Sequence, residues 1–282
     1  MFRRGIGFAI KLMSLPVARF FARKFLSFAY KLYEEWLWRQ ISGGPMPRHV
    51  AIIPDGNRRW ARKRGMDTSD GHAFGYERLK EVLQWLLELG IRAVTIYAMS
   101  NENCLYRPAK ERERLFELIK KGLRELLEDK DDLLRRYGVK VKVFGRLELV
   151  PEEIREIVRQ LESKTSSYNE RFLNIALCYG GRQEIVDAVK RIATDVKLGK
   201  LAISDIDEDV FSEYLYTSHM EELAEPDLVI RTSGEFRISN FLLWQSAYSE
   251  FYFCDVFWPD FRKIDLWRAI RSYQRRERRF GR

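Results

Sequence analysis

Short apolar runs alternate with longer amphipathic segments along most of the chain. The short runs have the length and composition of strands, and the longer segments have the pattern of helices. Strands and helices in alternation predict an α/β fold, with a single domain whose central, mostly parallel sheet is flanked by helices. The predicted strands are 49–54, 93–99, 139–144, 172–178, 227–231 and 250–254, and the predicted helices are 71–89, 108–137, 151–164 and 182–198.

The first 45 residues break this alternation. Phe21, Phe25, Phe28, Leu32 and Trp36 share one side of a predicted helix. No uncharged run approaches the roughly 20 residues that span a bilayer, and no small-residue cleavage site follows a clean apolar stretch, so we predict neither a spanning helix nor a secretory signal. The helix can lie on a membrane surface, or pack on the body or on a second subunit; we favour the membrane surface.

Charge supports the same division of the chain into a helical arm with its linker, 1–45, and one domain, 46–282. The net charge is +9, yet residues 1–40 carry eight Lys or Arg against two Glu, and residues 271–282 carry six Arg against one Glu. A nucleic-acid-binding protein usually spreads its basic residues over a docking face. The excess at both ends instead indicates a membrane-surface arm and a local anion site, with no nucleic-acid partner.

The three cysteines, Cys104, Cys178 and Cys254, are far apart in the sequence and odd in number. This spacing favours neither a disulfide framework nor a zinc site. We therefore expect no disulfide and a reducing compartment, with the protein in the cytoplasm and peripherally associated with the membrane.

Polar and cationic residues follow three of the predicted strands, where a parallel sheet binds its ligands. After the first strand, Gly56 lets the backbone approach a ligand closely, Arg58 and Arg59 offer charged donors, and Asp55 is a suitable oxygen ligand for Mg²⁺. Alone, Asp55-Gly56-Asn57 could be a turn and helix cap; the arginines that follow favour a phosphate site. Residues 100–107 follow the second strand, and Arg231, Arg237 and Ser239 lie at or after a later one.

Several ordered motifs together resemble the cis-prenyltransferases, the family of undecaprenyl and dehydrodolichyl diphosphate synthases. The matching segments are His49 to Trp60, Gly71-His72, Thr95 to Asn103 followed by Arg107-Pro108, Asp227 to Asp260, and the terminal Arg279-Phe280-Gly281. The chain has no paired Asp-rich motif of the all-helical trans-type synthases.

The resemblance implies a Mg²⁺-dependent prenyltransferase that adds isopentenyl diphosphate units, with cis double bonds, to an allylic diphosphate primer. The primer would be geranylgeranyl or farnesyl diphosphate. The product would be a long-chain polyprenyl diphosphate, the precursor of a glycosyl carrier lipid, and the growing chain would occupy an apolar tunnel.

The resemblance also implies residue roles. Asp55 would bind Mg²⁺ together with Glu250, and Asn103 would assist proton removal at the reacting carbons. In a homodimer, Arg279-Phe280-Gly281 would reach the site of the partner. The substrate-binding residues would be Gly56, Asn57, Arg58, Arg59, Trp60, His72, Ser100, Asn101, Glu102, Arg107, Arg231, Arg237, Ile238 and Ser239.

Some positions depart from the family pattern. Thr68 stands where many members have a diphosphate-binding Arg, Phe236 where they have a metal-linked His, and Cys104 where they have Trp. Many bacterial members have Gly in place of Arg58. These departures leave open which primer is used and how the metal site is completed.

Three other functions agree less well with the sequence. A non-catalytic subunit of the same fold is disfavoured because Asp55, Asn103, Arg231, Arg237 and Glu250 are all present. A nucleotide-binding module would need a glycine-rich or Walker loop, which the sequence lacks. A membrane-surface adaptor would use the arm alone.

Overall fold

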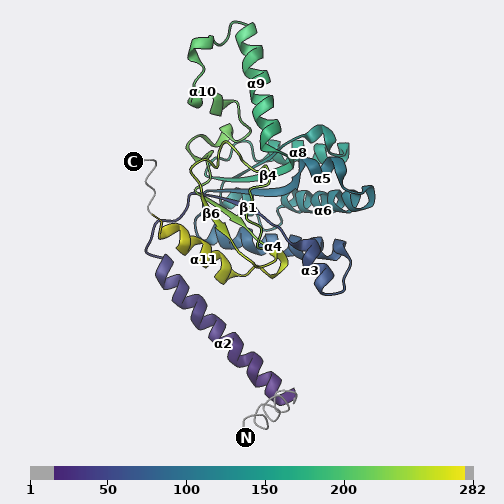
Figure 1. Cartoon of the computed structure of the whole chain (residues 1–282), viewed down its shortest axis with the longest axis vertical. Coiled ribbons are helices and arrows are strands. Elements are labelled where there is room, and N and C mark those ends of the chain that lie inside the picture. The colour runs from purple at the N-terminus through teal and green to yellow at the C-terminus, as the bar shows by residue number, and fades with distance from the viewer. Residues whose placement is uncertain (1–15, 277–282) are drawn as a thin grey trace. The chain divides into compact units, whose positions relative to one another are not determined.

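The computed structural model describes residues 16–276, with side chains from residue 24 onward (Figure 1). The motif Arg279-Phe280-Gly281 and the side chain of Phe21 lie outside the described part. Contacts divide the chain into two compact units. The larger unit holds Met46–Phe261, and the smaller combines the N-terminal helix with residues 262–276.

The larger unit is built on a six-stranded sheet in the order β3-β4-β2-β1-β5-β6, in which every pair is parallel. The central strand β1 is buried along its whole length, which explains its continuous apolar run. The predicted α/β fold with a parallel sheet is confirmed. The strands are β1 His49–Ile53, β2 Ala93–Ser100, β3 Val139–Phe144, β4 Arg171–Tyr179, β5 Leu228–Arg231 and β6 Glu250–Phe253.

Helices flank this sheet (Figure 1). The α-helices are α3 Asn57–Lys63, α4 Thr68–Glu88, α5 Asn101–Tyr106, α6 Ala109–Glu128, α7 Leu133–Arg136, α8 Glu152–Lys164, α9 Gly181–Lys197 and α10 Glu208–Glu213; short 3₁₀ helices cover Leu147–Leu149, Ile203–Asp205, Ser218–Leu223 and Trp258–Asp260.

Two predicted helices had wrong bounds. Helix α4 begins before residue 71 because the Asp67 carboxylate accepts a hydrogen bond from the Ser69 backbone N–H at 2.8 Å and caps the helix there. The predicted helix 108–137 is two helices. Asp129 adopts a left-handed backbone conformation that ends α6, and its carboxylate accepts a bond from the Leu133 N–H at 2.8 Å at the start of α7.

The smaller unit pairs α2, Pro16–Ile41, with α11, Lys263–Gln274. Trp38 lies 5.6 Å from Trp267 between ring centroids, and Leu37 is fully buried. The aromatic face predicted for the arm stays exposed in its described part, since Phe25 is 70% and Phe28 is 60% exposed. Within residues 16–276, no helix has both the length and the apolar character needed to cross a bilayer.

The prediction that the chain has no disulfide is wrong. Cys104 and Cys178 form one, with their Cα atoms 5.6 Å apart, whereas Cys254 is not disulfide-bonded. The reason is tertiary: β2 pairs with β4 so that Ser100 lies opposite Tyr179. Because α5 starts directly after β2, its first turn brings Cys104 beside the end of β4.

Candidate active site

The loops after β1 and β5 meet because these strands are neighbours in the sheet. The register places Ile53 opposite Arg231, so Asp55 and Thr232 lie side by side. The Thr232 hydroxyl donates to the Asp55 carbonyl at 2.7 Å and accepts from the Asp55 N–H at 2.9 Å. This paired contact fixes the backbone of Asp55, and no feature of the sequence alone singles out Thr232.

Arg231 lies at the centre of the first cluster of charges, and its side chain is only 4% exposed. Its guanidinium donates to Asp55 Oδ2 at 2.8 Å, to Ser239 Oγ at 2.6 Å and to the carbonyl of Arg237. The hydroxyl of Tyr97, a residue that we did not predict, donates to the Ser239 carbonyl at 3.2 Å. The predicted Asp55, Arg231, Arg237 and Ser239 are therefore brought together.

Arg59 joins the same cluster from α3. It donates to Glu235 Oε1 at 2.7 Å and to Ser233 Oγ at 2.6 Å, and it lies 3.5 Å from the Asp55 carboxylate. Arg237 pairs with the other oxygen of Glu235. Glu235 thus holds two arginines that were predicted to bind diphosphate, although it was itself not predicted.

A second cluster forms around Glu111, at the start of α6. Arg107 donates to its Oε1 at 2.8 Å, Arg58 lies 3.5 Å away and His72 Nε2 lies 3.8 Å away. Arg107 also donates to Asn103 Oδ1 at 3.0 Å, which links the cluster to α5. Glu111 was missed because a charged residue in an amphipathic helix gives no signal by itself.

Burial and, to a smaller extent, the charge of Arg107 lower the pKa of His72 to about 4, although Glu111 opposes the shift. The ring is therefore neutral near pH 7. Burial also lowers the pKa of Arg107. Two arginines and a neutral imidazole around a single carboxylate leave the cluster with excess positive charge, which suits a diphosphate.

The turn between the clusters requires glycine. Gly56 has φ of 102°, and a Cβ there would lie 2.6 Å from the Phe257 ring and 2.8 Å from Ser233 Cβ. Asn57 donates to the Pro54 carbonyl at 3.2 Å, while its Oδ1 is buried with no partner among the described residues.

The remaining predicted residues divide between the site and its support. Ser100 caps α5 by accepting from the Asn103 N–H at 3.1 Å, and Glu102 accepts from Asn240 Nδ2 at 3.2 Å. Trp60 is buried against Phe74, with ring centroids 4.9 Å apart, in the packing of α3 on α4. Asn101 has a buried Oδ1 with no partner in the described structure, and Ile238 lines a small cavity with Glu102.

Two of the positions that depart from the family pattern lie elsewhere. Thr68 is the first residue of α4, and the Phe236 side chain is 77% exposed.

Glu250 is not brought to Asp55 within one chain. It opens β6 opposite Leu228, whereas Asp55 lies beyond the other end of the strands, past the Ile53–Arg231 pair. No cluster of three or more His, Cys, Asp or Glu suited to a metal ion occurs between residues 16 and 276. The partly exposed Asp55 carboxylate still fits Mg²⁺, because this ion commonly takes one or two protein carboxylates and fills its shell with substrate phosphates and water.

A large apolar cavity adjoins the second cluster. It has a volume of about 1450 Å³, and Asn57 and His72 line one part of it. Its walls come from α4, α6 and the strands β2 and β4; leucine and isoleucine are the commonest lining residues, and charged residues such as Lys80 and Glu125 also line it. Further lining residues are Leu79, Leu83, Ile96, Leu115, Leu118, Ile119, Leu134 and Tyr137.

Cationic clusters at the carboxyl ends of a parallel sheet, beside a large apolar cavity, are typical of proteins whose ligands join a diphosphate to an apolar chain. The chain matches the family model described as putative undecaprenyl diphosphate synthase over residues 53–281. It therefore belongs to this family of cis-prenyltransferases and is a prenyltransferase.

Relatives of similar length carry names that agree with this family. The chain is 53% identical over 252 residues, covering 89% of it and 94% of the relative, to the tritrans,polycis-undecaprenyl-diphosphate synthase (geranylgeranyl-diphosphate specific) of Sulfurisphaera tokodaii. A protein of the same name from Methanopyrus kandleri is 51% identical over 269 residues, which cover 95% of this chain and 97% of that protein.

Solved structures share the fold. Lavandulyl diphosphate synthase from Lavandula x intermedia, in complex with dimethylallyl diphosphate, has a TM-score of 0.78 and 36% identity, covering 84% of this chain and 99% of that one. A probable undecaprenyl diphosphate synthase from Campylobacter jejuni has a TM-score of 0.67 and 30% identity, covering 84% and 100%.

Proposed function

We propose that this enzyme lengthens geranylgeranyl diphosphate by repeated addition of isopentenyl diphosphate, each time forming a cis double bond. The observation that carries the proposal is the pair of arginine clusters that meet at residues 55–59, one of them adjoining the cavity of about 1450 Å³. The names of relatives more than 50% identical support geranylgeranyl diphosphate, rather than farnesyl diphosphate, as the primer. A product of this kind would serve as the precursor of a glycosyl carrier lipid.

The reaction requires that the growing negative charge of the leaving diphosphate be neutralised. The bond between C1 of the primer and its diphosphate breaks, the alkene of isopentenyl diphosphate attacks C1, and a proton is lost. Arg58 and Arg107 would bind the leaving diphosphate, which preorganised positive groups stabilise as its charge grows. Mg²⁺, held by Asp55 and the diphosphate, would supply further neutralisation.

The second diphosphate would bind in the other cluster. Arg231, Arg237 and Ser239 would hold isopentenyl diphosphate, and Arg59 of the same cluster would add a further charged donor. The Asn103 side chain would face the reacting carbons and assist proton removal, as Arg107 already fixes its amide oxygen. Glu111 and Glu235 would keep the arginines in place until the substrates displace them.

The apolar cavity would receive the growing chain. Its wall of leucine and isoleucine side chains favours a hydrocarbon tail over water. The cavity extends to residues 129–137, so side chains such as Leu134 and Tyr137 would set how long the product becomes.

We further propose a homodimer. β6 is an edge strand of the sheet, and Tyr248 beside it is 66% exposed. Since Glu250 and Asp55 lie at opposite ends of the strands in one chain, a metal role for Glu250 requires Glu250 of the partner subunit. The segment Arg279-Phe280-Gly281 would complete the partner's site as well. Mixing inactive Asp55→Ala and Glu250→Ala proteins should then restore part of the activity, and no restoration would contradict a site shared in this way.

The arm would hold the enzyme at the membrane. Phe25, Phe28, Leu32 and Trp36 are 49–70% exposed on α2, and aromatic side chains of this kind bind at the interface of a bilayer. Deleting residues 1–45 should abolish co-sedimentation with anionic lipid vesicles. If the deleted protein still bound vesicles, the arm would not be the anchor.

The reaction itself is tested with labelled isopentenyl diphosphate, Mg²⁺ and each primer in turn, with product length and double-bond geometry as the readout. Asp55→Ala should abolish turnover at every Mg²⁺ concentration. Asp205→Ala, in an exposed 3₁₀ turn, is the matched control and should not change the rate. Near-native turnover by Asp55→Ala would overturn the assignment, and no turnover by the natural chain with either primer would favour a non-catalytic subunit or an adaptor.

A further inference from the structure

Helix α5 carries Asn103 but has little packing of its own. It spans six residues, and Cys104 is the single buried one in this fully described helix. Leu105 is 39% exposed and Tyr106 is 80% exposed. So short a helix is marginal in water, because nucleation costs more than a few hydrogen bonds return. The position of α5 must therefore depend on a bond or contact that links it to the sheet.

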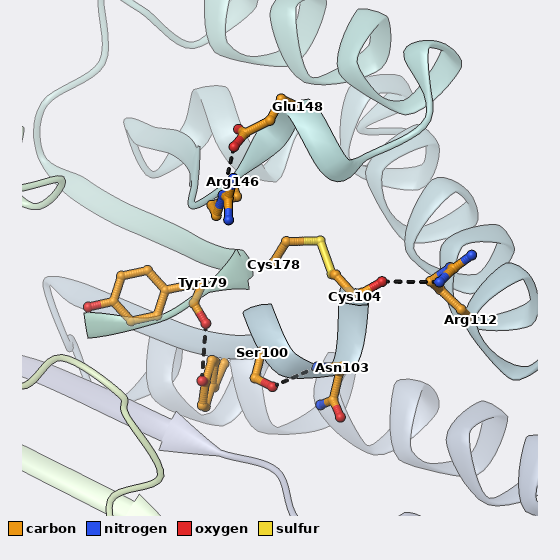
Figure 2. The surroundings of a disulfide bond; sticks show 9 residues. Ser100, Asn103, Cys104, Arg112, Arg146, Glu148, Cys178 and Tyr179 are labelled. Atoms are coloured by element: carbon orange, nitrogen blue, oxygen red, sulfur yellow. Dashed lines mark hydrogen bonds and ion pairs between the residues drawn. A yellow bond between two sulfur atoms is a disulfide. The ribbon is translucent and has the colours of Figure 1, made fainter. Parts of the chain in front are cut away.

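The disulfide provides that tie (Figure 2). It joins Cys104 to Cys178, which is fully buried near the end of β4. The anchor side is firm, because β4 is paired on both edges, with β2 and β3, and the Cys178 carbonyl accepts a hydrogen bond from the Arg146 N–H at 3.1 Å. On the helix side, Arg112 Nη1 donates to the Cys104 carbonyl at 3.2 Å.

The tied helix connects directly to the site. Asn103 precedes Cys104 in the chain, and its amide oxygen accepts from Arg107 at 3.0 Å. Figure 2 shows Asn103 and Cys104 on the same short helix, with the Asn103 side chain directed away from the disulfide. A shift of α5 would move the Asn103 amide and take away one of the two acceptors that hold the Arg107 guanidinium.

We propose that Cys104 and Cys178 are positioning residues of the active site: their disulfide fixes α5 on β4 and thereby holds Asn103 and Arg107 in working geometry. The inference rests on the proposed function. A dithiol such as dithiothreitol reduces the bond with two electrons and two protons, giving two protein thiols and its own cyclic disulfide. Buried thiols pack like small apolar side chains, so the reduced chain keeps its fold and loses the tie.

The first measurement counts thiols in denatured protein before and after reduction. One reactive thiol should appear before reduction and three after it, since the chain has three cysteines. Three thiols before reduction, in protein purified without reductant, would overturn the proposal.

The second measurement is steady-state kinetics well below the melting temperature. Reduction should lower kcat about tenfold or more, because misplacement of a reacting group by about 1 Å can cost a hundredfold. The KM for isopentenyl diphosphate should change less, because Arg231 and Ser239 stand on β5 and its loop. Reoxidation with oxidised glutathione should restore kcat. An unchanged kcat in protein with three thiols would refute the positioning role.

Two variants distinguish the effect of breaking the Cys104–Cys178 disulfide from other effects of the reductant. Cys104→Ala should have the low kcat from the start and should not respond to dithiothreitol. Cys254→Ala keeps the disulfide and should respond as the natural chain does. Equal responses of both variants would mean that reduction acts elsewhere, and the proposal would fail.

Hydrogen exchange gives a readout that needs no turnover. On reduction, the amides of residues 101–106 should lose protection, while those of β2 and of the middle of α6 should not. Unchanged protection of 101–106 would overturn the inference even if the chain proved to be a non-catalytic subunit. Conversely, a chain that loses this protection on reduction, but catalyses no condensation while it is oxidised, would overturn the proposed function alone.

Discussion

Arg231 offers a sharp test of how the site is held together. Its side chain is 4% exposed, and its donors reach the Asp55 carboxylate, the Ser239 hydroxyl and the Arg237 carbonyl. Replacing it by methionine keeps an unbranched chain of similar reach but removes every donor. The three acceptors then lose a partner that is itself almost fully buried, so we expect a loss of stability as well as of substrate binding.

The magnitude follows from the geometry. At 2.8 Å and an effective dielectric constant of about 20, the attraction between Arg231 and Asp55 is about 6 kcal/mol. Desolvation of both ions offsets much of this, and breaking a buried pair costs about 3–5 kcal/mol. The Asp55 side chain is 29% exposed, so water replaces part of what is lost. We therefore expect Arg231→Met to lower the free energy of unfolding by about 2–4 kcal/mol.

The assay is urea unfolding at pH 7 of the natural chain, Arg231→Met, Asp55→Asn and the double variant. The double variant should be more stable than the sum of the single losses predicts, by about 2 kcal/mol, because the second substitution removes the uncompensated charge. Arg237→Met is the control; its side chain is 59% exposed, so it should lose less than about 1 kcal/mol. Additive losses, within about 0.5 kcal/mol, would refute the coupling.

Two further predictions concern the turn and the histidines. Gly56→Ala should lose about 2–4 kcal/mol of stability, from its φ of 102° and its collision with Phe257, whereas Gly65→Ala, with φ of 67° and open space around it, should lose only about 1–2 kcal/mol; equal losses would contradict the steric account. Burial lowers the pKa of His49, His72 and His219 from 6.5 to about 4. Below about pH 6.5 the unfolded chain therefore binds more protons than the folded chain, and the free energy of unfolding should fall toward pH 4, by up to about 1.4 kcal/mol per pH unit for each histidine. Equal free energies of unfolding at pH 6.5 and pH 5, measured with denaturant, would contradict this.

Much of the fold could be read from local pattern. Each strand is a short apolar run, so the parallel sheet, with Asp55 and Arg231 at the carboxyl ends of neighbouring strands, was predicted correctly. Helix ends were less predictable. Asp129 ends α6 through a left-handed backbone conformation that its neighbours in the sequence do not signal.

The site itself was predictable only in part. Arg58, Arg59 and Arg107 carry charge at strand ends, and the structure places them in the clusters. Glu111 and Glu235, which hold these arginines, resemble ordinary surface carboxylates in the sequence. The carboxylates that pair with these arginines can be identified only from the tertiary structure, which brings distant segments of the chain together.

What the sequence determined by itself is the order of strands and helices and the residue types at each strand end, because both follow from local periodicity and local chemistry. What the tertiary structure decided is which of these residues touch. The disulfide between Cys104 and Cys178, 74 residues apart, exists because two parallel strands are neighbours. Glu250 is far from Asp55 in one chain because parallel pairing puts it at the start of β6. Register in the sheet, which no local pattern encodes, is the physical reason for both.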